Sequence, residues 1–398
     1  MKPHFCLRLL SLLLSVMVGT VLYGCGPLPG IMTVDSIEAL DASLILTGDD
    51  FPLMAYRAHE GSDGFKVASW NPWTFGWEYE EVEPGQYAYP PSLAMAPGGT
   101  PSVAFVWQSP DEYCGKMLTR VNGEWTEERF YPDIPEHLDL ERVALAYSPA
   151  GVPHIAFIAW NSETESWELW LAKREFNDWD RELVTSYPYP LPDPHDIVLR
   201  QFDVSIALDS QARPRIVASW GWEANPFDYV YRYDSRLIYA AWDGSAWQVE
   251  EFLTPPQYEA TLGGSIAVDS VDASHLITCG HNNGHNGQGD GNVIYWENTS
   301  GPWDGEILWY AAPLGGYAEC GGCDIAIRGG GAPRVVYSVY DGSEPKFVSA
   351  VKTPSGWTEE TILEEKIYSP SLAVTQSGQA AVGYVGDHHM GVDFYKGP

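Results

Sequence analysis

Apolar and polar residues alternate with a period of two in short runs along most of the chain, and Gly, Asp, Ser and Pro separate the runs. The clearest copy is PSLAMAPGGTPSVAF at residues 91–105, where two alternating runs flank a Gly-rich turn. Successive side chains of a β-strand point to opposite faces of its sheet, so this pattern predicts a strand hairpin. No segment shows a sustained helical period, which excludes the helical repeat architectures.

The hairpin pattern recurs in seven copies, which can be aligned on one residue of the first run. Neighbouring copies are 47 to 61 residues apart, and seven positions after the aligned residue each copy has Pro, Ser or Ala. A period of this size indicates a repeat architecture. The aligned residues are Ile45, Ala94, Ala146, Ala207, Ala267, Ala326 and Ala373.

A third alternating run follows each complete hairpin, as in LIYAAW at residues 237–242, and a short turn then leads to a phrase that begins with Trp. Glu stands three positions after the Trp, and an apolar residue stands five positions after it. In a strand, Trp would lie on one face and the other two residues on the opposite face. We interpret the glutamates as solvent contacts that protect an outer strand from pairing with another chain. The six copies are Trp77, Glu80 and Val82; Trp125, Glu128 and Phe130; Trp179, Glu182 and Val184; Trp247, Glu250 and Phe252; Trp303, Glu306 and Leu308; and Trp357, Glu360 and Ile362.

Four antiparallel strands in each repeat predict an all-β fold, the β-propeller. Six repeats supply four strands, whereas the seventh ends after its third strand. In the segment IMTVDSIEAL at residues 31–40, Met32, Asp35 and Ile37 have the spacing of the Trp phrase, so we expect this strand to complete the C-terminal blade. The prediction is seven four-stranded blades closed by the N-terminal strand, and a six-bladed ring with one irregular repeat is the alternative.

The turns before the Trp phrase read DGSAW, NGEW, NDW and SGW. In these turns the repeats resemble those of exported bacterial propellers of the sialidase-like and BNR-like group, over residues 31–398. The motif lacks the full Ser, Asp, Gly, Trp order of that group, so the resemblance implies an architecture more than an activity. A sialidase-like hydrolase would need an arginine cluster, of which Arg215 and Arg334 supply only two members, and the N-terminal arginine motif of the group is absent.

The beginning of the chain has the features of an export signal. Lys2 and Arg8 precede an apolar run at residues 9–22 that is too short for a lasting membrane span. The following LYGC resembles the bacterial lipobox, which implies that Cys25 is acylated and becomes the new N-terminus. A signal that is cleaved without lipid attachment is the alternative.

This interpretation divides the chain into a lipoprotein signal at residues 1–25, a tether and closing strand at 26–40, and a propeller at 41–398. If Cys25 carries acyl chains, the membrane is a partner through the lipid anchor. By the same resemblance, Gly26 at the next position favours the outer membrane, on its periplasmic side or at the cell surface.

The composition is strongly acidic. Removal of the signal leaves 20 basic and 54 acidic side chains, a formal balance of −34. This charge argues against nucleic acid as a partner and is explained most simply by solubility. We expect a monomer in the cell envelope.

The exported body has four cysteines in a compartment that permits disulfides. Cys279 ends the second strand of one repeat, and Cys320 and Cys323 precede the first strand of the next. These three residues should meet at the same end of the ring, so we predict a structural disulfide between Cys279 and one of the other two. A redox-active pair in the segment CGGC is disfavoured because such pairs are activated in a strand-to-helix setting.

Long, variable connections between blades are the expected place for recognition. The connection at residues 219–236 offers Trp220, Trp222, Tyr229 and Tyr231, whose aromatic faces could stack on a sugar ring or grip a peptide. The alternative is that these rings cover the hydrophobic rim of the blades.

Another connection contains His281, His285 and Asp290 among Gly and Asn, and these residue types could bind a divalent cation. The spacing matches no strict metal signature, so a solvated loop without an ion is the alternative. No other cofactor is indicated.

Serine recurs two positions before the aligned residue, at Ser43, Ser92, Ser205, Ser265 and Ser371, and this position holds Ala144 and Asp324 in the other two copies. Five serines around one axis indicate packing in the innermost strand rather than nucleophiles, because none has a His base in its repeat. The sequence assigns no catalytic residue. It favours a non-catalytic, membrane-anchored binding module for a carbohydrate or protein ligand, with a sialidase-like glycoside hydrolase as the alternative.

Overall fold

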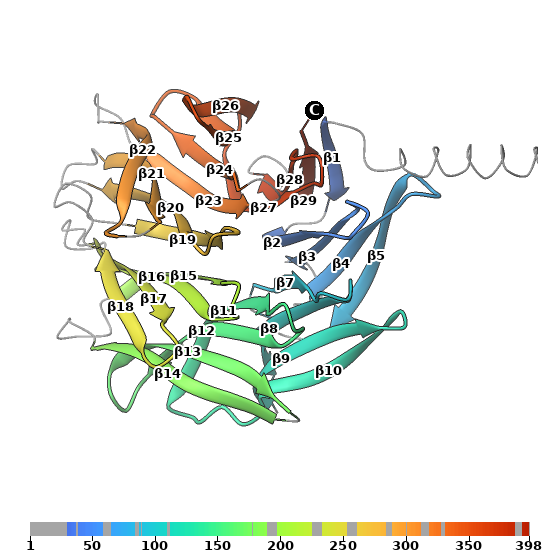
Figure 1. Ribbon diagram of the computed structural model, residues 1–398, viewed down its shortest axis with the longest axis vertical. Coiled ribbons are helices and arrows are strands. Elements are labelled where there is room, and N and C mark those ends of the chain that lie inside the picture. Colours follow the sequence, from blue (N-terminus) through green and yellow to red (C-terminus); the bar gives the residue numbers. More distant parts are fainter. Residues whose placement is uncertain are drawn as a thin grey trace, which may run out of the picture.

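The computed structural model describes residues 30–36, 39–58, 65–83, 87–88, 90–109, 112–176, 178–188, 197–224, 233–252, 261–283, 289–299, 301–311, 318–327, 331–386 and 392–397. In this part of the chain the regular elements are β-strands, which form seven antiparallel sheets. Figure 1 shows the sheets arranged around a central axis, with one strand of each sheet nearest to that axis. The fold is therefore the predicted seven-bladed β-propeller.

Blades are numbered from 1 to 7 in chain order, and within each blade the strands run outward from the axis. Blade 1 consists of β2 (Ala39–Leu46), β3 (Pro52–Ala58), β4 (Phe65–Asn71) and β5 (Gly76–Glu83). Blade 2 consists of β6 (Tyr87–Ala88) and β7 (Ser92–Met95), both paired with β8 (Pro101–Ser109), then β9 (Glu112–Val121) and β10 (Glu124–Tyr131). Blade 3 consists of β11 (Leu138–Tyr147), β12 (Pro153–Asn161), β13 (Ser166–Glu175) and β14 (Asp178–Pro188).

The remaining four-stranded blades follow the same order. Blade 4 consists of β15 (Ile197–Leu208), β16 (Pro214–Ala224), β17 (Tyr233–Trp242) and β18 (Trp247–Phe252). Blade 5 consists of β19 (Thr261–Val268), β20 (Ser274–Asn283), β21 (Gly289–Asn298) and β22 (Asp304–Ala311). Blade 6 consists of β23 (Glu319–Ile327), β24 (Pro333–Tyr340), β25 (Pro345–Thr353) and β26 (Gly356–Leu363). Blade 7 consists of β27 (Ile367–Val374), β28 (Ala380–Gly386), β29 (Val392–Lys396) and the N-terminal strand β1 (Gly30–Asp35).

The N-terminal strand closes the ring. β1 pairs antiparallel with β29, and Gly30 lies opposite Lys396. This pairing confirms the predicted closure and rules out the six-bladed alternative. The expected alignment within the strand was wrong by three positions, because the strand bulges at Val34, which is buried and takes the place of the apolar residue of the Trp phrase instead of Ile37.

The same bulge explains the Trp phrase in the other blades. Register shifts in the outer strands of blades 1, 2, 3, 5 and 6 fall on the apolar residue of the phrase. In blade 2, Trp125 packs on the core shared with blade 1, whereas Phe130 is buried in the core shared with blade 3. Each outer strand therefore contacts both neighbouring blades, and the prediction that Trp and the apolar residue face opposite ways is confirmed.

The repeated glutamates pair across blades as well as facing solvent. Glu80 of blade 1 forms an ion pair with Arg120 of blade 2, at 3.1 Å, and the Arg120 guanidinium lies over the ring of Trp125. Equivalent ion pairs join Glu128 to Arg174 and Glu306 to Lys352. The glutamates thus also fasten each blade to the next, which the interpretation as solvent contacts did not include.

The recurring serines of the innermost strands form a partial ring of hydrogen bonds around the axis. Four of the five serines, and Asp324 at the same position of blade 6, accept a hydrogen bond from a backbone N–H of the next blade through a side-chain oxygen, whereas the Ser265 hydroxyl donates to Asp324. Such bonds satisfy buried amides, so these serines have the structural role that was predicted for them. The acceptors and donors are Ser371 and Leu44 (2.9 Å), Ser43 and Leu93 (3.0 Å), Ser92 and Leu145 (2.9 Å), Ser205 and Ile266 (3.2 Å), and Asp324 and Leu372 (2.6 Å).

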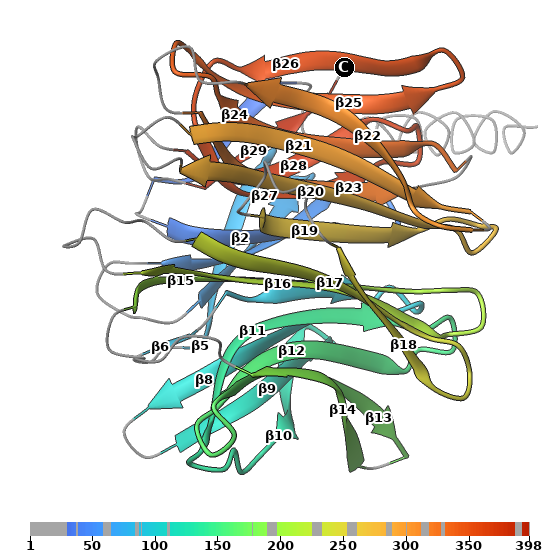
Figure 2. The same cartoon turned by 90° about the vertical axis from the view of Figure 1, so that its left-hand side faces the viewer.

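The two ends of the ring differ in their connections. One end, called the short-turn end, holds the turns between the first and second strands and between the third and fourth strands. The other end, called the loop end, holds the remaining connections. Figure 2 shows the turns β17–β18, β21–β22 and β25–β26 together on the right-hand side. Because Gly30 pairs with the last residue of β29, the chain enters the ring at the short-turn end.

Candidate functional site

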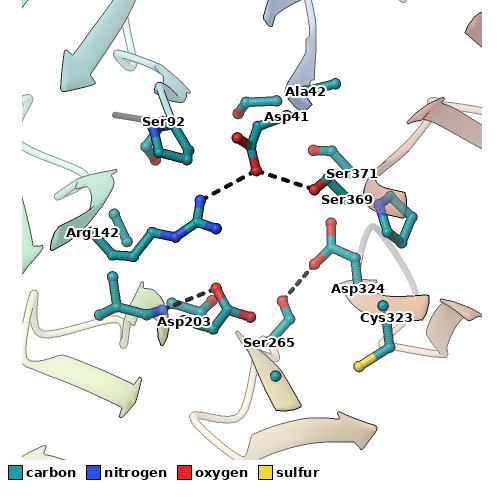
Figure 3. A pocket seen from close by; sticks show the side chains of 18 of the residues that line it. Asp41, Ala42, Ser92, Arg142, Asp203, Ser265, Cys323, Asp324, Ser369 and Ser371 are labelled. Carbon is teal, nitrogen blue, oxygen red and sulfur yellow. Dashed lines mark hydrogen bonds and ion pairs between the residues drawn. The ribbon is translucent and has the colours of Figure 1, made fainter. Parts of the chain in front are cut away.

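A cavity of about 840 Å³ lies at the axis of the propeller. The innermost strands of all seven blades contribute to its wall. In every innermost strand the lining residues stop two positions before the last residue of the strand, and Arg57 stands near the end of the second strand β3, so the cavity belongs to the loop end. Figure 3 shows Asp41, Arg142, Asp203 and Asp324 converging on this space from different blades.

Asp41 organises one side of the cavity. Its carboxylate accepts hydrogen bonds from Arg57 at 3.0 Å, from Arg142 at 3.3 Å and from the Ser369 hydroxyl at 3.2 Å. The side chain of Asp41 is 11% exposed, so these donors compensate a charge that has lost most of its water. The two arginines are thereby fixed at the wall with their charge partly balanced.

Asp203 of β15 faces the cavity without a direct ion pair in the described contacts. Its carboxylate accepts a hydrogen bond from the backbone N–H of Val204 at 3.0 Å. Burial raises the pKa of Asp203 to about 6, an effect that Asp324 reinforces and Arg142 opposes. The carboxyl group can therefore gain or lose a proton near neutral pH.

Asp324 of β23 stands at the position that serine occupies in five other blades. It accepts hydrogen bonds from the Ser265 hydroxyl at 2.5 Å and from two backbone amides, those of Ile325 and Leu372. Burial raises the pKa of Asp324 to about 6 in spite of these donors. The cavity thus holds two carboxyl groups that titrate in the same range and influence each other.

The arrangement suits a ligand with many hydroxyl groups. Carboxylates accept hydrogen bonds, serine hydroxyl groups can accept and donate them, and guanidinium groups donate in a planar fork. Two carboxyl groups with raised pKa values in one cavity could also act as a general acid and a general base.

The three cysteines expected to meet do come together. Cys279 of β20 and Cys320 and Cys323 of β23 line the cavity wall, and Cys279 forms thiol hydrogen bonds with both of the others. The sulfurs are in the thiol form, so the disulfide stays a prediction. Burial raises the pKa of Cys323 to about 11. A thiol with so high a pKa supplies little thiolate, which disfavours a redox-active pair.

The residues between these thiols explain the sequence CGGC. A Cβ atom at Gly321 would lie 2.4 Å from the carbonyl oxygen of Ile367, and one at Gly322 would lie 2.8 Å from Pro370. Both contacts are closer than side chains tolerate, so the approach of blade 7 requires glycine here.

The aromatic residues predicted to bind a ligand are placed only in part. Trp220 is 1% exposed and packs with Tyr187 at a ring distance of 5.2 Å. The prediction that Trp220 contacts a ligand is therefore wrong, and its ring belongs to the core. Trp222 lies on β16 but its side chain is not described, and Tyr229 and Tyr231 lie outside the described residues.

The site formed by the candidate metal ligands stays a prediction, because the structure describes these residues only in part. His281 and Asp290 lie on the paired strands β20 and β21, with side chains that are not described, and His285 lies outside the described residues. No group of three metal-binding side chains suited to an ion occurs among the described residues. Cys25 also lies outside them, and none of the described residues forms a helix that could cross a membrane.

The arginines considered for a sialidase-like site are elsewhere. Arg215 forms an ion pair with Asp209 at 3.2 Å, near the turn between β15 and β16, at the short-turn end. Neither Arg215 nor Arg334 lines the cavity. The arginines that do line it, Arg57 and Arg142, occur at no recognisable motif, which is why the sequence did not identify them.

One signal in the sequence did point to the cavity. Asp324 is the only charged residue at the recurring serine position, and a carboxylate in a crowded innermost strand requires a local explanation. Asp41, Arg142 and Asp203 share a position four residues before the aligned residue, but the other copies there have Pro, Gly or Ser, so no repeat pattern marks them.

The fold and the cavity define the class of protein as a seven-bladed propeller with an acidic axial site. No protein-family model and no curated protein matches the sequence. Among solved structures, an ulvan lyase of polysaccharide lyase family PL25 is similar, with a TM-score of 0.60 and 11% identity, over 92% of this chain and 95% of that one. The α-L-arabinofuranosidase Arb93A from Fusarium graminearum has a TM-score of 0.50 and 11% identity, over 93% of this chain and 98% of that one. The polysaccharide lyase Uly1 has a TM-score of 0.50 and 9% identity, over 89% of each chain. At these identities the likeness establishes the propeller fold.

Proposed function

We propose that the chain is an exported, lipid-anchored β-propeller that binds a carbohydrate in its axial cavity. The observation that carries the proposal is the cavity itself, which has a volume of about 840 Å³ and walls of fixed carboxylate, guanidinium and hydroxyl groups. Pockets for small ligands measure roughly 300 to 1,000 Å³, so the cavity fits one or a few sugar units. A flat protein partner would use it poorly, which makes a protein ligand the weaker alternative. The three similar proteins are two polysaccharide lyases and an arabinofuranosidase, and this agrees with the proposal.

The charges favour a neutral or basic sugar. Four acidic residues line the cavity against two arginines, Arg57 and Arg142. Both arginines already bind Asp41, so little positive charge is left for an acidic sugar. The strongly acidic chain would also repel a polyanionic glycan. A sialic acid substrate is therefore disfavoured.

The sequence LYGC supports attachment of the protein to a membrane through Cys25, with the outer membrane of the cell envelope as its place. Mass spectrometry of the mature N-terminus should find an acylated Cys25, and Cys25→Ser should abolish the modification. An unmodified N-terminus after a cleaved signal would remove the anchor from the proposal and leave the cavity untouched.

Binding of the exported body to an array of neutral, amino and acidic glycans tests the cavity. We expect saturable binding to a neutral or amino sugar, weakened about tenfold or more by Arg142→Ala because a charged hydrogen bond contributes on the order of 1.5 to 3 kcal/mol. Arg120→Ala is the matched control, since Arg120 also has an acidic partner but lies on the outer part of blade 2. Equal effects of the two substitutions, or no binding to any glycan, would contradict the proposal and direct attention to protein ligands.

A glycoside hydrolase is the second candidate, because Asp203 and Asp324 both have a pKa raised to about 6 and face one cavity. Glycosidases use a pair of carboxyl groups, one as acid and one as base or nucleophile. The glycan that binds should then be cleaved, with new reducing ends, and Asp203→Asn and Asp324→Asn should abolish cleavage while binding persists. Binding without cleavage over pH 4 to 8 would exclude this candidate and leave the binding module.

A further inference from the structure

The short-turn end of the ring carries exposed apolar side chains. Six of the eleven large apolar side chains that are exposed in the described part of the chain lie there, and we call them the apolar fringe. Phe176 is 99% exposed and Trp73 is 72% exposed. The apolar fringe consists of Ile31, Trp73, Phe75, Val121, Phe176 and Val271.

The fringe residues come from different blades but share one face. Trp73 and Phe75 belong to the turn between β4 and β5, Val121 ends β9, and Phe176 lies between β13 and β14. Val271 belongs to the turn between β19 and β20, and Ile31 is the second residue of β1. First and third strands of a blade run parallel, so all these positions fall on the short-turn end.

The backbone gives a second, independent indication. Phe75 and Phe176 both have a φ of 52°, in the left-handed region that bulky residues rarely adopt. Asn122 holds a φ of 54° in the corresponding turn of blade 2, and asparagine tolerates this conformation well. Phenylalanine at these turns therefore lowers the stability of the fold and, being exposed, gains little packing in return.

The chain length before β1 identifies what the fringe meets. Four residues separate Cys25 from Gly30, and the five residue steps between them span at most about 18 Å in a fully extended chain. Because β1 begins at the short-turn end, an acylated Cys25 holds this end next to the bilayer. This step rests on the lipid anchoring in the proposed function.

We propose that the apolar fringe inserts into the interfacial layer of the membrane that holds the lipid anchor. The ring then lies with its short-turn end, the right-hand side of Figure 2, on the membrane. The cavity belongs to the loop end and is therefore turned away from the membrane. Trp and Phe suit the boundary between headgroups and acyl chains. Acidic residues in turns of the same end, such as Asp50, Asp243 and Asp272, fit zwitterionic lipids and oppose anionic ones.

A fluorophore at the fringe tests the orientation in the acylated protein. The environment-sensitive dye NBD is attached at Phe176→Cys, with Ile307→Cys as the matched control, because Ile307 is 56% exposed but lies on the outer strand β22. In phosphatidylethanolamine and phosphatidylcholine vesicles we expect a blue shift and quenching by nitroxide lipids at position 176 only. Background from dye that attaches to the native Cys323 is measured by labelling the unsubstituted chain.

The unacylated body, residues 26–398, tests the fringe without the anchor. Flotation with the same vesicles should show weak binding that falls about tenfold or more in the double variant Phe75→Asn and Phe176→Asn, in line with the loss of two apolar rings. The melting temperature should stay equal or rise, because asparagine suits a left-handed turn. Ile307→Asn should leave flotation unchanged.

Three results would overturn the proposal: a water-exposed dye at position 176, unchanged flotation of the double variant, or fringe-dependent dimerisation without vesicle binding. Other measurements test the proposed function. An unmodified Cys25 would show that the protein has no lipid anchor, and a glycan array without binding would show that it has no carbohydrate ligand. Neither of those results changes what flotation of the unacylated body shows.

Discussion

At the scale of single residues, the axial cavity is built by departures from a repeated pattern. Serine at the recurring position accepts an amide from the next blade, and Asp324 does the same at 2.6 Å while adding a carboxyl group to the cavity. Aspartate in place of serine at this one position thus keeps the structural hydrogen bond and adds an ionisable group to the cavity. Asp203 has no such pattern and is identified only by the geometry.

The raised pKa of Asp203 predicts a stability effect with a definite sign. An aspartate whose pKa is about 6 in the folded protein, above its ordinary value of 3.8, destabilises the fold once it ionises. The penalty is absent below about pH 4 and complete above about pH 7. The free energy of unfolding of Asp203→Asn, relative to the unsubstituted protein, should therefore rise between pH 4.5 and pH 7.5.

Urea unfolding of both proteins at several pH values measures this difference. The contributions of the other carboxylates to the pH dependence are the same in both proteins and drop out of the difference. A difference that stays constant or falls as the pH rises would show that Asp203 keeps an ordinary pKa in the folded protein. Asp341, whose pKa is lowered by hydrogen bonds from Ser343, is the control: its contribution to stability changes only below its ordinary pKa of 3.8, so the difference for Asp341→Asn should stay level between pH 4.5 and pH 7.5.

At the scale of elements, the outer strand of each blade works in two directions. Its Trp packs on the preceding blade, and its Glu and bulged apolar residue face the following blade, so one strand seals two interfaces. Trp179 packs against Phe130 of the preceding blade at a ring distance of 6.1 Å, and Trp357 packs against Tyr295 at 4.9 Å. The repeated Trp phrase is therefore explained by the contacts that each outer strand makes with both neighbouring blades.

Close packing at this bulge predicts a strong effect of a small change. A Cβ atom at Gly115 would lie 2.4 Å from the buried ring of Phe130. We expect Gly115→Ala to lower the free energy of unfolding by about 1 to 3 kcal/mol, as overpacked cores do. Gly98→Ala is the control, since nothing lies within 4 Å of a Cβ there. Equal unfolding midpoints in urea for the two variants would contradict the packing argument.

At the scale of the whole molecule, β1 determines whether the ring is closed. Val34 is 1% exposed and joins a core cluster with Met54, Tyr56 and Phe394. A chain that starts at residue 36 should melt at least about 10 °C lower than one that starts at residue 30, and should self-associate through the open edge of β29. Calorimetry and light scattering measure both effects.

A peptide of residues 30–36 supplied in trans should restore the truncated chain in part, because it can pair with β29 as β1 does. A truncated chain that remains monomeric and equally stable would show that blade 7 does not need its fourth strand.

The sequence was sufficient for the architecture because periodicity records which face each side chain occupies. Seven aligned hairpins and six Trp phrases predicted seven blades and the closing strand, and the bulge at Val34 explains the misplaced alignment inside that strand. The candidate site was less accessible. Arg57, Arg142 and Asp203 lie close together only because different blades meet at the axis, and no spacing along the chain encodes that meeting.

Pairing of the first strand with the last also sets an order in time. Gly30 cannot meet its partner Lys396 until nearly the whole chain has been made, which at typical synthesis rates takes on the order of tens of seconds. The strand that is made first is thus the last to find its place. Through that interval both edges of the unfinished ring stay unpaired, and completion of the chain, rather than formation of any one blade, marks the moment of assembly.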